Sequence, residues 1–327
     1  IYSQFQVAQV GTYAYYLLAV EEALARDQHF LKELLFSLDE CTIGAAAGCG
    51  TSFSINRELI ARLLGFSRCS PNALDAVANR DLALRVLSSL SILGTTLSRM
   101  AQDYQLWTTQ EFAFFDLPDN LCGSSSMMPQ KKNPYLFEVI KGKSATLNGM
   151  LVQALTCMHN VPFSNSVETS VEALQGIDIV LKNMSDILLL TELLVSKARP
   201  VKAQFNKSIN KGVAVATGVA EYLVKEKKLP FREAHFKIGE KISRAISQQV
   251  DPLEEVFSLV SDGLRAQKAI FWAHANEYGG GPGKNTTIKS YQSAKRRLRI
   301  DVNWIKSIER RWESAEIKLQ REIKKII

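Results

Sequence analysis

The chain has 327 residues, of which 46% are hydrophobic and 22% charged, and its formal net charge is +7. This length and composition allow a core of ordinary size and exclude a disordered or collagen-like chain. No apolar run reaches the roughly 18 residues of a membrane span. The five cysteines include no CxxC pair, so a zinc site and a disulfide framework are not expected. We therefore expect a cytoplasmic protein with reduced thiols, no metal and no cofactor.

Helical periodicity dominates from the start of the chain. Apolar residues recur at spacings of three and four over four long ranges, 7–25, 72–106, 135–158 and 167–198. A helix over 72–106 would be about 52 Å long and would need partners along its whole length, so a bundle is implied. Strand signals are nearly absent. Beyond residue 200 the predicted helices are shorter, at 211–224, 230–248 and 252–260.

The change in helix length predicts two domains, a long-helix bundle over 1–200 and a smaller helical domain over 201–327. The final helix, 303–327, carries one apolar stripe on a highly charged surface. From Lys284 onward there are 13 basic and 5 acidic residues, so the positive charge is confined to this tail. The tail either docks on the bundle with its basic side chains outward, which we favour, or contacts nucleic acid or an acidic membrane. Nucleic acid is therefore not the expected partner.

A polar segment, 122–134, separates the second and third long helical ranges. It contains three serines, two lysines and Asn133, and Pro134 fixes the start of the next helix. Hydroxyls, backbone amides and ammonium groups of this kind hold a carboxylate and stabilise the oxyanion derived from a carbanion. On composition alone, a flexible linker with a helix cap is the alternative.

The segment resembles the signature loop of the fumarase/aspartase superfamily, and Met128–Pro134 is similar to that of its argininosuccinate lyase branch. The resemblance covers roughly residues 1–285. Further segments match the branch in the same order, at 50–59, 74–81, 97–103, 111–119, 138–143 and 278–282.

This resemblance implies an all-α fold, a long-helix bundle of the fumarase/aspartase type with a smaller helical C-terminal domain. It also implies a homotetramer in which three subunits build each active site. The implied reaction is that of a carbon–nitrogen lyase. An N-substituted aspartate undergoes anti-elimination and releases fumarate, without a cofactor.

The resemblance also assigns roles within the loop and the helix that follows it. Ser125 takes the place of the catalytic serine, the general base, and Ser126 beside it is expected to contact substrate. Lys131 and Asn133 would bind the substrate carboxylate and its developing charge. Glu138 would polarise a histidine.

The sequence departs from the branch at several substrate-binding positions. Ile1–Gln9 resembles the segment Tyr-Thr-His-Leu-Gln, with Ser3 in place of threonine and Gln4 in place of the catalytic histidine. Glutamine forms hydrogen bonds but does not titrate near neutral pH, so Glu138 would lack its partner. Asn165 stands where the branch has a tyrosine that grips the amino-acid end of the substrate.

Two hypotheses follow from these departures. The first is an argininosuccinate-lyase-like enzyme with an altered pocket, for which His159 is a weaker alternative proton donor. The second is a non-catalytic or partner-dependent relative, a scaffold or one half of a split enzyme. The N-terminal domain of the branch does not precede Ile1 in this sequence, so a separate N-terminal domain or chain is an expected partner.

Overall fold

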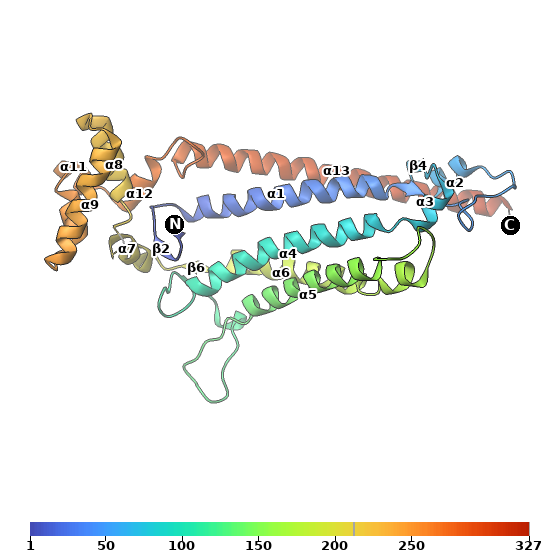
Figure 1. The fold of residues 1–327 in the computed structure, drawn as a ribbon, viewed down its shortest axis with the longest axis horizontal. Helices are drawn as coiled ribbons and strands as arrows, with labels where there is room; N and C mark the ends of the chain where they lie inside the picture. Colours follow the sequence, from blue (N-terminus) through green and yellow to red (C-terminus); the bar gives the residue numbers. More distant parts are fainter. Residues whose placement is uncertain (212, 327) are drawn as a thin grey trace. The chain divides into compact units, whose positions relative to one another are not determined.

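The structure is a computed structural model that describes residues 1–211 and 213–326, and most of it is helical (Figure 1). The predicted all-α class is confirmed. Regular strands in the described part of the chain are limited to three two-residue pairs. These are β1 (Tyr2–Ser3) with β2 (Gln6–Val7), β3 (Glu40–Cys41) with β4 (Arg68–Cys69), and β5 (Phe115–Asp116) with β6 (Arg199–Pro200). Among the helices within 1–211 and 213–326, none is both long and apolar enough to cross a membrane.

The α-helices are, in chain order, α1 (Tyr13–Leu38), α2 (Arg57–Leu63), α3 (Ala73–Ala78), α4 (Asp81–Trp107), α5 (Leu136–Cys157), α6 (Ile177–Lys197), α7 (Lys202–Lys211), α8 (Ala216–Lys227), α9 (Phe231–Ser247), α10 (Pro252–Phe257), α11 (Asp262–Arg265), α12 (Ala269–His274) and α13 (Lys284–Ile326). A 3-10 turn covers Asp119–Leu121 and a π-helical turn covers Glu168–Glu172.

Most of the predicted long helices are present, with differences at their ends. The helix predicted over 135–158 is α5. The one predicted over 72–106 is broken between α3 and α4, because Asn79 leaves the helical region with ψ at 124°. The helix predicted from residue 7 begins only at Tyr13. Val7 pairs in β2, and the Thr12 hydroxyl accepts a hydrogen bond from the Tyr15 amide at the start of the helix. The predicted terminal helix is the second half of α13, and its last residue, 327, lies outside the described residues.

The chain forms two compact units, and each of them is discontinuous in sequence. This differs from the contiguous domains 1–200 and 201–327 expected from the sequence. A boundary does fall between Ala198 and Arg199, but α1 and α13 each contribute residues to both units. Unit 1 consists of Ile1–Glu21, Trp107–Asp116 and Arg199–Lys295, and unit 2 of Glu22–Leu106, Leu117–Ala198 and the residues from Arg296 onward.

The core of unit 2 lies where α4, α5 and α6 pack together. Its fully buried side chains include Leu97, Phe137 and Leu147. Gly94 lets α4 approach α5 closely, so that the Ser144 hydroxyl donates to the Gly94 carbonyl at 2.9 Å. A Cβ at position 94 would lie 2.7 Å from Leu147 Cδ1. Close helix packing at this glycine therefore fixes the helix that follows the signature loop.

We predict that Gly94→Ala lowers the free energy of unfolding by about 1–3 kcal/mol, because the new methyl group overpacks a fully buried leucine. Gly239→Ala is the matched control. It lies within α9, where a Cβ meets no atom within 4 Å, so the higher helix propensity of alanine should raise the free energy of unfolding by up to about 1 kcal/mol. Urea unfolding measures both. Equal free energies of unfolding for the two variants would refute the close approach of α4 to α5 at Gly94.

The second half of α13 docks within unit 2 against α1 and the turn after α2. Lys32 Nζ lies 2.8 Å from Asp301 Oδ1 and 4.7 Å from the centre of the Trp304 ring. Arg311 Nη1 lies 2.7 Å from Asp39 Oδ2. The tail thus docks along one stripe, as the favoured interpretation of the sequence expected.

The Asp39–Arg311 pair predicts a pH dependence of stability. Burial alone would raise the pKa of Asp39, but hydrogen bonds from Arg311 and Ser67 outweigh it and hold that pKa below the usual 3.8. A lowered folded-state pKa stabilises the fold above the unfolded-state value, and this stability is lost as pH falls through the folded-state value.

Asp39→Asn should therefore lower the free energy of unfolding at pH 7 by about 1–2 kcal/mol. Urea unfolding at a series of pH values should show that the difference between parent and variant shrinks below about pH 4. A difference that stays constant down to pH 2 would show that the carboxylate charge is not what stabilises this contact.

Candidate active site

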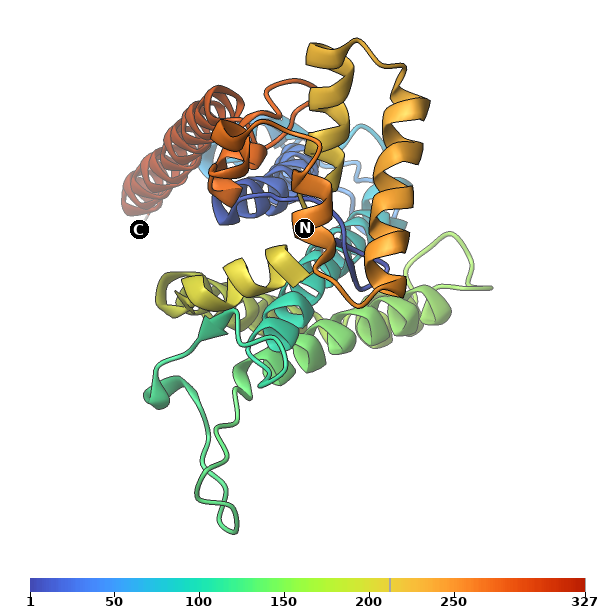
Figure 2. The same ribbon diagram turned by 90° about the vertical axis from the view of Figure 1, so that its left-hand side faces the viewer.

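The signature segment forms a narrow loop that projects from the helices of unit 2 before α5 begins (Figures 1 and 2). Its base is closed by a backbone bridge, in which the Gly123 amide donates to the Asn133 carbonyl at 2.8 Å and the Asn133 amide donates to the Gly123 carbonyl at 2.9 Å. Residues 124–132 between them are mostly exposed. The loop is therefore held at its base and open at its tip.

Ser125 lies just beyond this bridge and is half-buried, whereas Ser126 is exposed. The Met128 backbone amide donates to the Ser125 hydroxyl oxygen at 3.1 Å. A donor on this oxygen favours its deprotonated form over its protonated form. The local fold therefore gives Ser125, and not its neighbour, one of the features of a general base.

The two lysines of the loop differ in their surroundings. Lys132 Nζ lies 2.9 Å from Asp119 Oδ1 and is neutralised. Lys131 is exposed, and no partner for its ammonium group is found among the residues that the structure describes. Lys131 is thus the loop cation that remains available to an anionic substrate. The sequence did not reveal the role of Asp119, because nothing in its spacing pairs it with Lys132.

Glu138 occupies the first turn of α5 and is exposed. It lies at the same end of α5 as the loop, as does Asn133, which is half-buried at the bridge. Asn165 is exposed in the connection that follows the other end of α5. Since α5 has 22 residues, its ends are about 33 Å apart. Within one chain, the predicted loop residues and Glu138 therefore lie at one end of α5, and Asn165 lies beyond the other end.

Ser3 and Gln4 belong to unit 1, at the tip of the hairpin formed by β1 and β2. Gln4 and Phe5 have φ values of 50° and 60°, as the two central residues of a type I′ turn do. Such values strain residues other than glycine, and strain of this kind often lies at functional sites. The Tyr2 and Ser208 hydroxyls, 2.6 Å apart, tie the hairpin to α7. The Gln4 side chain is therefore presented on a short, anchored, exposed turn.

Groups of three or more histidine, cysteine or carboxylate side chains placed to hold a metal ion are not found within 1–211 and 213–326. The chemistry that these residues offer is that of a hydroxyl, an ammonium group and amides.

Two family models match the chain, one described as Lyase over residues 2–149 and one described as Argininosuccinate lyase C-terminal over residues 213–260. The argininosuccinate lyase of Halorhodospira halophila is 38% identical over 253 residues, which are 77% of this chain and 54% of that protein. That of Methylococcus capsulatus is 37% identical over 264 residues, 80% of this chain and 56% of that protein. The chain spans about half the length of the curated relatives it matches.

Solved structures of related proteins share the fold. EDDS lyase in complex with formate superimposes with a TM-score of 0.88 at 26% identity, over 100% of this chain and 68% of that chain. An EDDS lyase variant with bound fumarate gives the same values. Class II fumarase from Schistosoma mansoni has a TM-score of 0.58 at 17% identity, over 78% of this chain and 61% of that chain.

The geometry of the loop predicts its dynamics. Within the described residues 124–131, the Met128 and Lys131 amides donate hydrogen bonds, and the other backbone amides of this stretch should exchange with solvent within seconds. The amides of Ile140 and Leu147, fully buried in α5, should exchange orders of magnitude more slowly. Hydrogen exchange followed by mass spectrometry tests this. A loop as protected as α5 would not be a gate for substrate.

Proposed function

Because the chain belongs to the argininosuccinate lyase branch of the fumarase/aspartase superfamily, we propose that it catalyses carbon–nitrogen bond cleavage in an N-substituted aspartate and releases fumarate. The observation that carries the proposal is the different surroundings of two loop side chains, Ser125 and Lys131. Ser125 accepts a backbone hydrogen bond while Lys131 is left without a counter-ion in the described structure. Identity of 35–38% to argininosuccinate lyases supports the same reaction class.

In the proposed reaction, Ser125 removes a proton from Cβ of the substrate. That proton is acidic only when the neighbouring carboxylate accepts the electron pair as an aci-carboxylate. Lys131 and the amide of Asn133 would stabilise this extra charge, because they lie at the base of the same loop. Ser126 would bind the carboxylate beside them. The electron pair then forms the Cα–Cβ double bond as the Cα–N bond breaks.

The leaving nitrogen distinguishes this chain from its relatives. An amine or guanidine leaves readily only when it takes up a proton, and Gln4 has none to give near neutral pH. Gln4 would instead hold the substrate by hydrogen bonds, next to Ser3. Elimination by this chain therefore favours a leaving group that departs without protonation, or requires a proton donor from elsewhere. Because a proton donor could come from another protein, a partner-dependent relative remains the second candidate function.

The proposed assembly is a homotetramer formed through the long helices of unit 2. Apolar side chains on these helices remain exposed in a single chain, among them Ile92 on α4, Leu155 on α5 and Leu189 on α6. Burial of such faces against other copies is the usual way to cover them. It would also allow Asn165 of one copy to approach the loop of another. A separate N-terminal domain or chain and a cytoplasmic location are part of this proposal.

We predict that Ser125→Ala lowers elimination about 10²–10⁴-fold, since the proton-abstracting oxygen is removed. Ser124→Ala, a change of the same size one residue earlier, is the control and should leave the rate within a few-fold. Fumarate absorbance with a panel of N-succinyl amines and amino acids measures both.

Gln4→His should raise the rate for amine and guanidine leaving groups and do little for groups that leave unprotonated. Glu138 would orient and charge the new imidazole. The measurement is the ratio of the rates for the two leaving-group types. If this ratio is unchanged and Ser125→Ala does not change the elimination rate, the chain is a scaffold and not an enzyme by itself.

A further inference from the structure

Two cysteines lie opposite each other on adjacent strands of unit 2. In the parallel pair formed by β3 and β4, Cys41 is the direct partner of Cys69. Neighbouring strands run about 4.8 Å apart, which lies within the range of Cα separations that disulfides bridge. Residues that face each other in a ladder project to the same side of it, so the two thiol groups share one face. Both thiols are free in the structure.

The residues just before the cysteines show how close side chains come in this register. Glu40 is the direct partner of Arg68, and Arg68 Nε lies 2.8 Å from Glu40 Oε2. This ion pair is on the outer face, because Arg68 is exposed. Successive side chains of a strand point to opposite faces, and Cys41 is only 2% exposed on the inner one. The two thiols are thus paired on the inner face as the two charged groups are on the outer face.

Hydrogen bonds around the ladder hold both cysteine positions in place. The Ser70 amide, next to Cys69, donates to the Cys41 carbonyl at 2.9 Å. The Arg57 guanidinium then joins the two strand ends, because its Nε donates to the Ile43 carbonyl and its Nη2 to the Ser70 carbonyl, both at 2.9 Å. The backbone at the two cysteines is therefore already aligned before any bond forms between the sulfur atoms.

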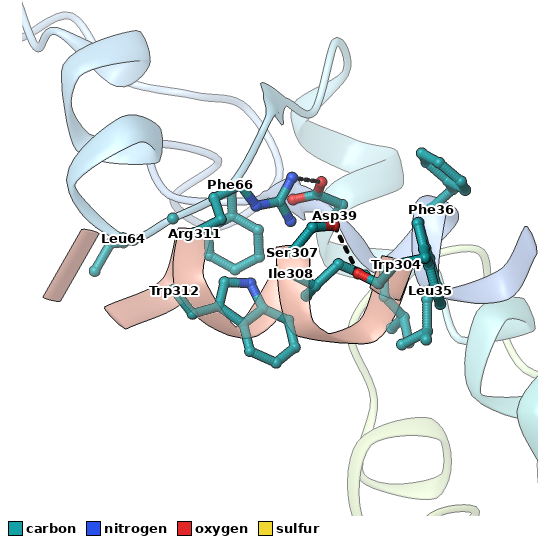
Figure 3. A pocket seen from close by; sticks show the side chains of 12 residues that line it. Leu35, Phe36, Asp39, Leu64, Phe66, Trp304, Ser307, Ile308, Arg311 and Trp312 are labelled. Carbon is teal, nitrogen blue, oxygen red and sulfur yellow. Dashed lines mark hydrogen bonds and ion pairs between the residues drawn. The ribbon is translucent and has the colours of Figure 1, made fainter. Parts of the chain in front are cut away.

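The segment between the two cysteines, residues 42–68, contains α2, and we call it the α2 lobe. The structure describes all of this segment, and within it only Ala45 and Ala61 have buried side chains. Its base lies directly after Asp39, whose ion pair with Arg311 docks α13 (Figure 3). A segment with so few buried contacts opens readily unless its ends are tied. A covalent bond between its ends restricts such opening.

We propose that Cys41 and Cys69 are a redox-active pair, which a small-molecule disulfide such as oxidised glutathione converts reversibly into a disulfide that locks the α2 lobe. In a reducing compartment the pair stays reduced, and the bond forms when the glutathione pool becomes more oxidised. This inference concerns a site separate from the signature loop and does not depend on the proposed lyase reaction.

The two thiols have different parts in the exchange because their burial differs. Cys69 is half-buried and Cys41 is buried, so the oxidant reaches Cys69 first. The Cys69 thiolate attacks one sulfur of oxidised glutathione, and one glutathione leaves as a thiolate. The Cys41 thiolate then attacks the Cys69 sulfur and releases the second glutathione. The protein loses two protons and two electrons, and the two glutathione molecules take them up.

Peptide mapping tests which cysteines are joined. The full chain is equilibrated with glutathione buffers of increasing oxidised fraction, alkylated and digested with trypsin without reduction. Tryptic peptide 33–57 contains Cys41 and Cys49, and peptide 69–80 contains Cys69. The linked pair of peptides should appear in the parent and persist in Cys49→Ser, and dithiothreitol should reverse it. Loss of the linked pair in Cys49→Ser, or its absence at every glutathione ratio, would overturn the proposal.

The strand register has its own control. In the Cys49→Ser background, Arg68→Cys with Cys69→Ser moves the second thiol by one residue, to the outer face of β4. Its disulfide with Cys41 should form about tenfold more slowly than that of the native pair, because the two side chains then point to opposite faces. Equal rates for thiols at positions 68 and 69 would show that the register of β3 and β4 does not select the pair.

Hydrogen exchange tests the lock itself. The Ser70 amide donates across the strands and the Ile60 amide donates within the α2 lobe. In the oxidised parent both should exchange about tenfold more slowly than in the reduced parent, because the disulfide suppresses the opening that exposes them. The Val219 amide, in α8 of unit 1, should not change, and Cys69→Ser treated in the same way should show no slowing. Unchanged exchange at Ser70 and Ile60 in the disulfide-linked protein would refute the lock.

Discussion

The long helices of this protein carry more apolar surface than a single chain can cover, and most of its organisation follows from that constraint. In α1, which has 26 residues, no side chain reaches full burial. The faces of α5 and α6 that point away from the shared core expose leucines and valines. Such surface is removed from water only when further helices pack against it. Within unit 2, the second half of α13 is one of these helices.

The need to bury apolar surface also explains why α5 is firmly packed while the loop before it is open. Its buried face packs closely against α4 at Gly94, and this contact holds the helix in place. The polar loop before it has almost nothing to bury and is held only by the bridge between Gly123 and Asn133. A rigid support and an open loop thus meet within a few residues. This arrangement would let the loop move without loosening the bundle.

Much of this architecture could be predicted from the sequence, because helical periodicity and helix-breaking prolines act locally. The start of α5 after Pro134 and its end near Cys157 are examples. The break at Asn79 was missed because the surrounding residues keep their helical spacing, and only the backbone at one residue departs. The discontinuous units were also missed, since a sequence pattern does not show that both ends of α13 pack in different places. Within the loop, the sequence singled out Ser125 and Lys131, but only coordinates separate Lys131 from the neutralised Lys132.

The hairpin that presents Gln4 is compatible with a histidine at the same position. Its turn places position 4 in the left-handed region of backbone space, which histidine adopts more readily than most side chains. The Tyr2–Ser208 contact holds the hairpin whatever residue stands at the tip. In the genetic code, glutamine and histidine codons differ by a single base. A histidine at position 4 would thus need one base change and no rearrangement of the backbone.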